Sequence, residues 1–184
     1  MPTVFKVWGT RSDETRLVYP CDRFLEGVAD AYYRGITIHA SPKVIFRWLC
    51  QMRIAPYSYD WIDNFGRKSP RELTPKLNEL RIGQHVMTIF ELVDFEEDRQ
   101  FTIRMKRDFF THKVVGDTVV SYVIEPGDGG SCRLLVKLLV RYPKGLLGWV
   151  TRLTLPPGDL IMMRRQLMNF KELSERVQNV AEGD

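Results

Sequence analysis

Alternating apolar and polar positions dominate the second half of the chain. One side of the segment around 101–106 carries Phe101, Ile103 and Met105, and the other side carries polar residues. The same alternation predicts strands at 85–95, 100–107, 113–126 and 131–142, whose short connections require antiparallel neighbours. In the last of these strands the polar side carries Arg133, Lys137 and Arg141. The pattern therefore predicts a sheet with one wet face and one apolar face that needs a cover.

A strand followed directly by a helix opens this arrangement. Residues 31–39 are rich in aromatic and β-branched side chains, which favour a strand. Ser41 and Pro42 then provide a helix N-cap and first turn. The helix is predicted to continue to about Met52, because apolar residues recur at three-and-four spacing.

A second helix is expected at residues 160–179, after an irregular connector at 143–155. Pro156 and Pro157 are predicted to precede this helix, with Asp159 as its cap. Its apolar stripe consists of Leu160, Met163, Leu167, Phe170 and Val177. A helix of this length spans about 30 Å, enough to cover the sheet. The predicted class is α+β, a helix-grip fold with a curved antiparallel sheet wrapped around a long C-terminal helix.

Several local motifs resemble one superfamily. They are Trp8-Gly9-Thr10, Ile36-Thr37-Ile38-His39-Ala40-Ser41-Pro42, Trp48-Leu49-Cys50-Gln51-Met52, the run from Tyr57 to Arg67, and Pro156-Pro157-Gly158-Asp159 followed by Met163-Arg164-Arg165. Together they resemble a bacterial subgroup of the START, Bet v 1-like and polyketide cyclase (SRPBCC) superfamily. The resemblance implies a cavity between the C-terminal helix and the sheet, and no shared catalytic residues. Residues 31–180 would form this domain, with residues 1–30 as an extension packed on it.

Aromatic residues are concentrated in and just after the first helix. Tyr and Trp combine a large apolar surface with one hydrogen-bonding group, which suits a pocket for an amphipathic ligand. The alternative is that these side chains simply fill the core. The candidate ligand-binding residues are Trp48, Tyr57, Tyr59, Trp61, Phe101, Ile103, Met105, Met163, Leu167 and Phe170.

Motifs for other chemistry are weak. His39, His85 and His112 lie on separate elements without metal-ligand spacing, so no metal or cofactor is predicted. No GxSxG nucleophile motif occurs. Asp60 and Asp63 could form an acid–base pair, although capping of a short helix explains them better.

Composition narrows the choice of partners. The net charge is +4, from 27 basic and 23 acidic residues that are spread along the chain, which argues against a nucleic-acid groove. No apolar run approaches the roughly 18 residues of a membrane span, so no stable membrane insertion is expected. Cys21, Cys50 and Cys132 form no CxxC pair, which favours free thiols and a cytoplasmic location.

Three functions remain open at this stage. The first is binding of a small hydrophobic or aromatic ligand in the internal cavity. The second is a cyclase- or dehydratase-type enzyme acting on a polyketide-like substrate in the same cavity. The third is a co-chaperone-like interaction module that uses the open sheet face or the segment from Gly145 to Trp149. By default residues 143–155 form a packed connector, and their alternatives are a portal at the cavity entrance, a membrane-touching loop or a homodimer contact.

Overall fold

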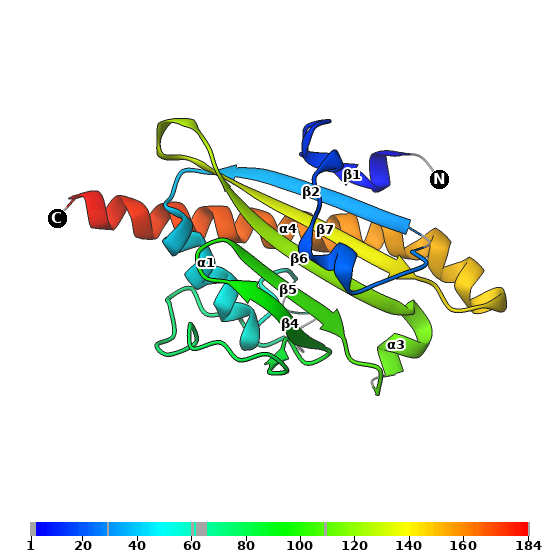
Figure 1. Cartoon of the computed structure of the whole chain (residues 1–184). Helices are drawn as coiled ribbons and strands as arrows, with labels where there is room; N and C mark the ends of the chain where they lie inside the picture. Colours follow the sequence, from blue (N-terminus) through cyan, green and yellow to red (C-terminus); the bar gives the residue numbers. More distant parts are fainter. Residues whose placement is uncertain (1–2, 29, 60, 62–65, 109, 184) are drawn as a thin grey trace.

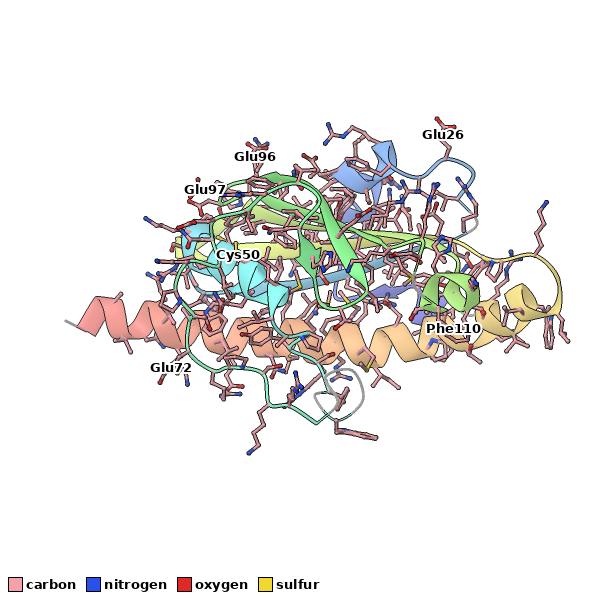
Figure 2. All side chains as sticks on the ribbon, turned by 90° about the horizontal axis from the view of Figure 1, so that it is seen from below. Glu26, Cys50, Glu72, Glu96, Glu97 and Phe110 are labelled. Atoms are coloured by element: carbon pink, nitrogen blue, oxygen red, sulfur yellow. The ribbon has the colours of Figure 1, made fainter. Side chains whose placement is uncertain are left out.

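The chain folds into three layers in the computed structural model, which describes residues 3–28, 30–59, 61, 66–108 and 110–183 (Figure 1). A sheet forms the middle layer, and the long helix α4 (Gly145–Gly183) runs along one of its faces. Figure 2 shows the N-terminal segment around Glu26 on the opposite side of the sheet from α4. The predicted α+β helix-grip class is confirmed.

The sheet has seven strands in the order β1-β2-β7-β6-β5-β4-β3. Every neighbouring pair is antiparallel except β1 with β2. The parallel pair brings two backbones very close, since a Cβ on Gly9 would lie 2.1 Å from the Gly35 carbonyl oxygen. The strands are β1 (Val7–Trp8), β2 (Asp30–Ile38), β3 (His85–Val86), β4 (Phe90–Glu96), β5 (Gln100–Met105), β6 (Asp117–Pro126) and β7 (Cys132–Arg141).

Helices α1 (Pro42–Cys50) and α3 (Phe110–Val115) lie wholly within the described residues and accompany α4. Helix α1 follows β2 directly, with Ser41 at its N-cap and Pro42 in its first turn, as predicted. Helix α3 lies beside the first turns of α4 (Figure 1). Short 3-10 helices occupy Thr3–Phe5, Glu14–Arg16, Pro20–Arg23, Gln51–Arg53 and Asp128–Gly130.

The predicted start of the C-terminal helix at residue 160 is wrong. Helix α4 begins at Gly145 and continues through Pro156 and Pro157. These prolines remove two backbone donors, but the carbonyls that they would have paired with belong to Arg152 and Leu153, which are exposed to solvent. Asp159 lies inside the helix and forms a buried ion pair instead of a cap.

Two predicted strands are also shorter than expected. The segment that begins near Lys113 is helical in α3, and β6 starts only at Asp117. The predicted strand 85–95 is divided into β3 and β4 by a turn, within which Met87 has a positive φ of 43°. The alternation of side chains therefore predicted that these strands exist but not where they end, because the turns that end them impose no alternation.

The outer face of the sheet is covered, which corrects the expectation of one wet face. Residues 14–25 pack on it and form a second core with the strands. Arg133 donates to Glu14 at 2.7 and 2.8 Å, and Lys137 donates to Asp22 at 2.6 Å. Lys137 is therefore buried and Arg133 half-buried in ion pairs, and of the three predicted water-facing residues only Arg141 is exposed. The second core contains Tyr19, Cys21, Leu25, Val119, Leu135 and Leu139.

All three cysteines are buried free thiols. Burial raises the pKa of Cys21 to about 11 and that of Cys50 to about 12, and it also raises the pKa of Cys132. Because the thiolate is the reacting form, we expect a disulfide reagent at pH 8 to react with the native protein at least about 100-fold more slowly than with the guanidinium-unfolded protein. Absorbance of the released thiol measures both rates. Rapid reaction of one thiol in native protein would contradict this expectation.

Candidate functional site

The inner face of the sheet carries the apolar part of the site. Trp48 of α1 meets Tyr57 edge-on at 5.9 Å between ring centroids, and Tyr57 meets Phe170 of α4 at 5.6 Å. Phe101 and Ile103 of β5 and Leu167 of α4 are fully buried in the same core. The structure therefore brings six of the ten predicted residues into one core under α4. Met105, at the end of β5, is also buried.

The remaining three predicted residues lie at its margin or outside it. Met163 is half-buried and packs against this core. Tyr59 is half-buried, and Trp61 is 74% exposed, so these two residues do not belong to the buried aromatic group. The Asp60 and Asp63 pair lies outside the described residues.

A buried ion pair crosses from the sheet to α4. Arg34 is 1% exposed and projects from the inner face of β2. Its Nη2 donates to Asp159 Oδ2 at 2.6 Å and to the Phe5 carbonyl at 2.9 Å, and its Nη1 donates to the Tyr33 carbonyl at 3.0 Å. Its Nε is buried, and no acceptor for it exists among the described residues. One charge-bearing donor is therefore left over inside the protein.

A tyrosine–aspartate group lies next to this pair on the inner face. The hydroxyls of Tyr32 and Tyr142 are in hydrogen-bond contact, and Tyr142 also donates to Asp30 Oδ2 at 3.0 Å. Lys6 forms an ion pair with the same Asp30. The Arg34 guanidinium lies 5.7 Å from the Tyr32 ring centroid, so the two groups form one continuous polar network.

A third polar contact ties α4 to the sheet and to the segment after α1. Tyr122 of β6 donates to Gln166 Oε1 at 2.8 Å, and Gln166 Nε2 donates to the Pro56 carbonyl at 2.6 Å. One turn along the helix, Asn169 Nδ2 donates to the Tyr57 carbonyl at 2.7 Å. These buried contacts hold the aromatic group in place against α4.

The electrostatics of the network follow from its burial. Burial raises the pKa of Asp159 to about 6, although the Arg34 guanidinium acts in the opposite direction. Burial likewise raises the pKa of Tyr32 to about 12, and it raises the pKa of Tyr122 and Tyr142 still further. The tyrosines are therefore neutral donors at neutral pH, and Asp159 is the group whose charge changes close to neutrality.

The raised pKa of Asp159 predicts a pH dependence of stability. A carboxyl group whose pKa is 3.8 in the unfolded chain and about 6 in the native protein stabilises the fold below pH 4, and this contribution is lost as pH rises through 6. The unfolding free energy of the wild type, measured relative to that of the Asp159→Asn variant, should fall by up to about 3 kcal/mol as the pH rises from about 4 to 7. Urea denaturation of both proteins across this range measures the difference. A constant difference would contradict the raised pKa.

The residues of this network were not predicted from the sequence. The burial of Arg34 could have been predicted, because the alternation Tyr32, Arg34, Ile36 places it on the inner face of its strand. A cation in that position needs a partner. The sequence predicts Asp159 only as a helix cap. Tyr142 and Gln166 carry no local signal, because their partners are distant in the sequence.

A surface hollow opens beside the network at the start of α4. It is lined by Tyr142, Pro143, Lys144, Gly148, Trp149 and Arg152. The Arg152 guanidinium lies 5.1 Å from the Tyr142 ring centroid. The hollow therefore leads from solvent to the tyrosine–aspartate group.

Within the described ranges no group of three or more His, Cys, Asp or Glu side chains could hold a metal ion. None of the described helices combines the length and the apolar composition that a membrane span requires.

Comparison with known proteins identifies the fold. No protein-family model and no curated protein match the sequence. A hypothetical protein from Helicobacter pylori superposes with a TM-score of 0.55 at 13% identity, covering 86% of this chain and 95% of that chain. A structural-genomics target from Mesorhizobium loti superposes with a TM-score of 0.52 at 13% identity, covering 80% and 98%.

The structural match extends to a START superfamily protein from Mycobacterium smegmatis, with a TM-score of 0.49 at 15% identity over 80% of this chain and 98% of that chain. The Helicobacter pylori and Mesorhizobium loti matches support the architecture of a sheet packed against a long C-terminal helix. Such distant matches carry the architecture and no residue roles.

Proposed function

We propose that this START/Bet v 1-like chain binds a small amphipathic molecule between the sheet and α4. The apolar part of the ligand would lie against the aromatic and aliphatic side chains of the inner face. Its polar end would accept a hydrogen bond from Arg34. Binding sites of this kind combine an apolar lining with a few polar groups that fix orientation.

The observation that carries this proposal is the buried Arg34–Asp159 pair with its unpartnered Nε. A buried ion pair contributes little net stability compared with apolar residues of similar volume, so packing alone does not explain it. An unpaired buried donor costs further free energy. A ligand oxygen that accepts from Nε would recover that cost.

Entry of the ligand requires side chains to move. Trp48, Tyr57 and Phe170 contact one another in the structure, so the apolar end of a ligand would have to displace at least one of them. The hollow beside Tyr142 borders the tyrosine–aspartate group, and the Tyr32 ring of that group adjoins Arg34.

The amphipathic aromatic anion anilinonaphthalene sulfonate is a suitable probe. We expect saturable fluorescence enhancement with one probe per chain, and native mass spectrometry of the protein from its own host should show a bound small molecule. Met163→Trp fills space beside the apolar core and should weaken probe binding at least about tenfold.

Met168→Trp is the matched control for this variant. Met168 lies on the same helix and is 47% exposed, so probe affinity should not change. Equal affinities of the Met163→Trp and Met168→Trp variants, or the absence of saturable binding, would argue against the proposed site.

A cyclase- or dehydratase-type enzyme on the same site is the second candidate. The converging tyrosines and the raised pKa of Asp159 favour it, because a group that titrates near pH 6 can exchange a proton near neutrality. Turnover of a β-polyketone substrate should then show an inflection near pH 6 that Asp159→Asn removes. A pH profile that Asp159→Asn leaves unchanged would exclude Asp159 from this role.

A further inference from the structure

An exposed apolar stripe runs along the first half of α4. Leu146, Trp149, Val150 and Leu153 recur at the three-and-four spacing of one helix face, and they are 77, 62, 42 and 41% exposed. Ile161, 56% exposed, continues the same face two turns later. This spacing usually marks a face that packs on a core, yet here it faces solvent.

The opposite side of the same helix holds α4 on the protein. Gly148 and Thr151 are buried, and Thr151 donates to the Val114 carbonyl of α3 at 2.9 Å. At 100° per residue these positions lie across the helix axis from the stripe. The first turns of α4 also project past the ends of the strands (Figure 1), so the stripe is not covered by the sheet.

Exposed cations accompany the stripe along the chain. Residues 144–165 contain Lys144, Arg152, Arg164 and Arg165, all exposed. The single acid in this range is Asp159, which is buried against Arg34 and adds no free negative charge. The second half of α4 differs, because Glu172 and Glu175 accompany Lys171 and Arg176 there.

Helix α3 adds to the same end of the molecule. Figure 2 shows Phe110 of α3 close to the first half of α4. Phe110 is 75% exposed, and Lys113 on the same helix is exposed as well. The apolar and cationic groups of both helices are therefore gathered in one region.

We propose that this face of α4 docks on an anionic membrane surface, with the stripe in the headgroup boundary and the cations on lipid phosphates. A helix with Trp and Leu on one side and flanking Lys and Arg is suited to lie in that interface. A second copy of the chain is a poorer occupant, because two such surfaces would bring eight cations together without free acids from the same segment. This proposal does not depend on the proposed function.

Vesicle sedimentation tests the proposal with the full chain. The protein should bind vesicles of phosphatidylcholine with about 30% phosphatidylserine, and it should bind pure phosphatidylcholine vesicles far more weakly. A Trp149→Ser/Leu153→Ser double variant should lower the partition coefficient at least about tenfold. Lys144→Gln/Arg165→Gln should lower it about fivefold for each cation removed, and only for the anionic vesicles.

Val180→Ser is the matched control, because Val180 is 63% exposed at the other end of the same helix. Its binding and the thermal unfolding of all variants should match the wild type. Equal binding to both kinds of vesicle, no binding to the anionic kind, or unchanged binding of the double variant would overturn the proposal. A dimer in light scattering that the double variant dissociates would assign the stripe to a second copy and would also overturn it.

Discussion

An Arg34→Met variant is expected to lose about 3–5 kcal/mol of unfolding free energy at pH 8. At this pH the Asp159 carboxylate is ionised in the wild type, and the variant leaves it buried without its partner. The loss should shrink at pH 5, where Asp159 takes up a proton and no longer needs a cation. Urea denaturation at both pH values measures these differences.

The double variant Arg34→Met/Asp159→Leu is the control for this prediction. It removes both charges and keeps apolar volume, so most of the lost stability should return. If the double variant also fails to bind the sulfonate probe, the ion pair serves binding rather than folding. If Arg34→Met alone lowers the unfolding free energy by less than about 1 kcal/mol, water reaches the Arg34–Asp159 pair.

A Phe170→Ala variant should be destabilised by a similar amount, about 3–5 kcal/mol. Phe170 is fully buried and contacts Tyr57, which in turn contacts Trp48, so its removal leaves a cavity in the middle of the aromatic group. Thermal and urea unfolding both measure the loss. A small loss would show that the neighbouring rings collapse into the vacated space.

Phe110→Ala is the matched control because it removes the same atoms from a side chain that is 75% exposed. Its unfolding free energy should stay within about 0.5 kcal/mol of the wild type. Comparison of the Phe170→Ala and Phe110→Ala variants therefore separates the effect of burial from the effect of losing an aromatic ring.

The strands and the two main helices could be predicted because their periodicity is local. Alternating spacing marks the apolar sides of β5 and β7, and helical spacing marks the core-facing side of α4 between Leu160 and Val177. The fold class followed from the order of these elements. The same periodicity placed Phe101, Ile103, Leu167 and Phe170 in one core, as the structure shows.

The start of α4 could not be predicted because local preference and tertiary contact disagree there. Two adjacent prolines normally mark the end of a helix or the residues before its start. Here Asp159 is held by Arg34 from a strand 125 residues earlier in the sequence, and Thr151 is held by α3. Contacts between residues so far apart in the sequence cannot be predicted from the pattern of a short segment.

The covered outer face was missed for a related reason. Lys137 and Arg133 have the spacing of water-facing residues, and only their distant partners Asp22 and Glu14 reveal that Lys137 is buried and Arg133 half-buried. The polar network under α4 was missed in the same way, because it combines residues of β2 with Tyr142, which follows β7, and with Asp159 of α4.

The second core has a consequence for the order in which the protein assembles. Its contacts join the start of the chain to strands that are made much later, with sequence separations of 100 for Cys21 with Ser121, 115 for Asp22 with Lys137 and 119 for Glu14 with Arg133. Closing such long loops is entropically costly until the β6–β7 ladder exists. We therefore expect residues 14–25, although synthesised first, to dock last, so that protection of their amides from hydrogen exchange appears after that of β6 and β7.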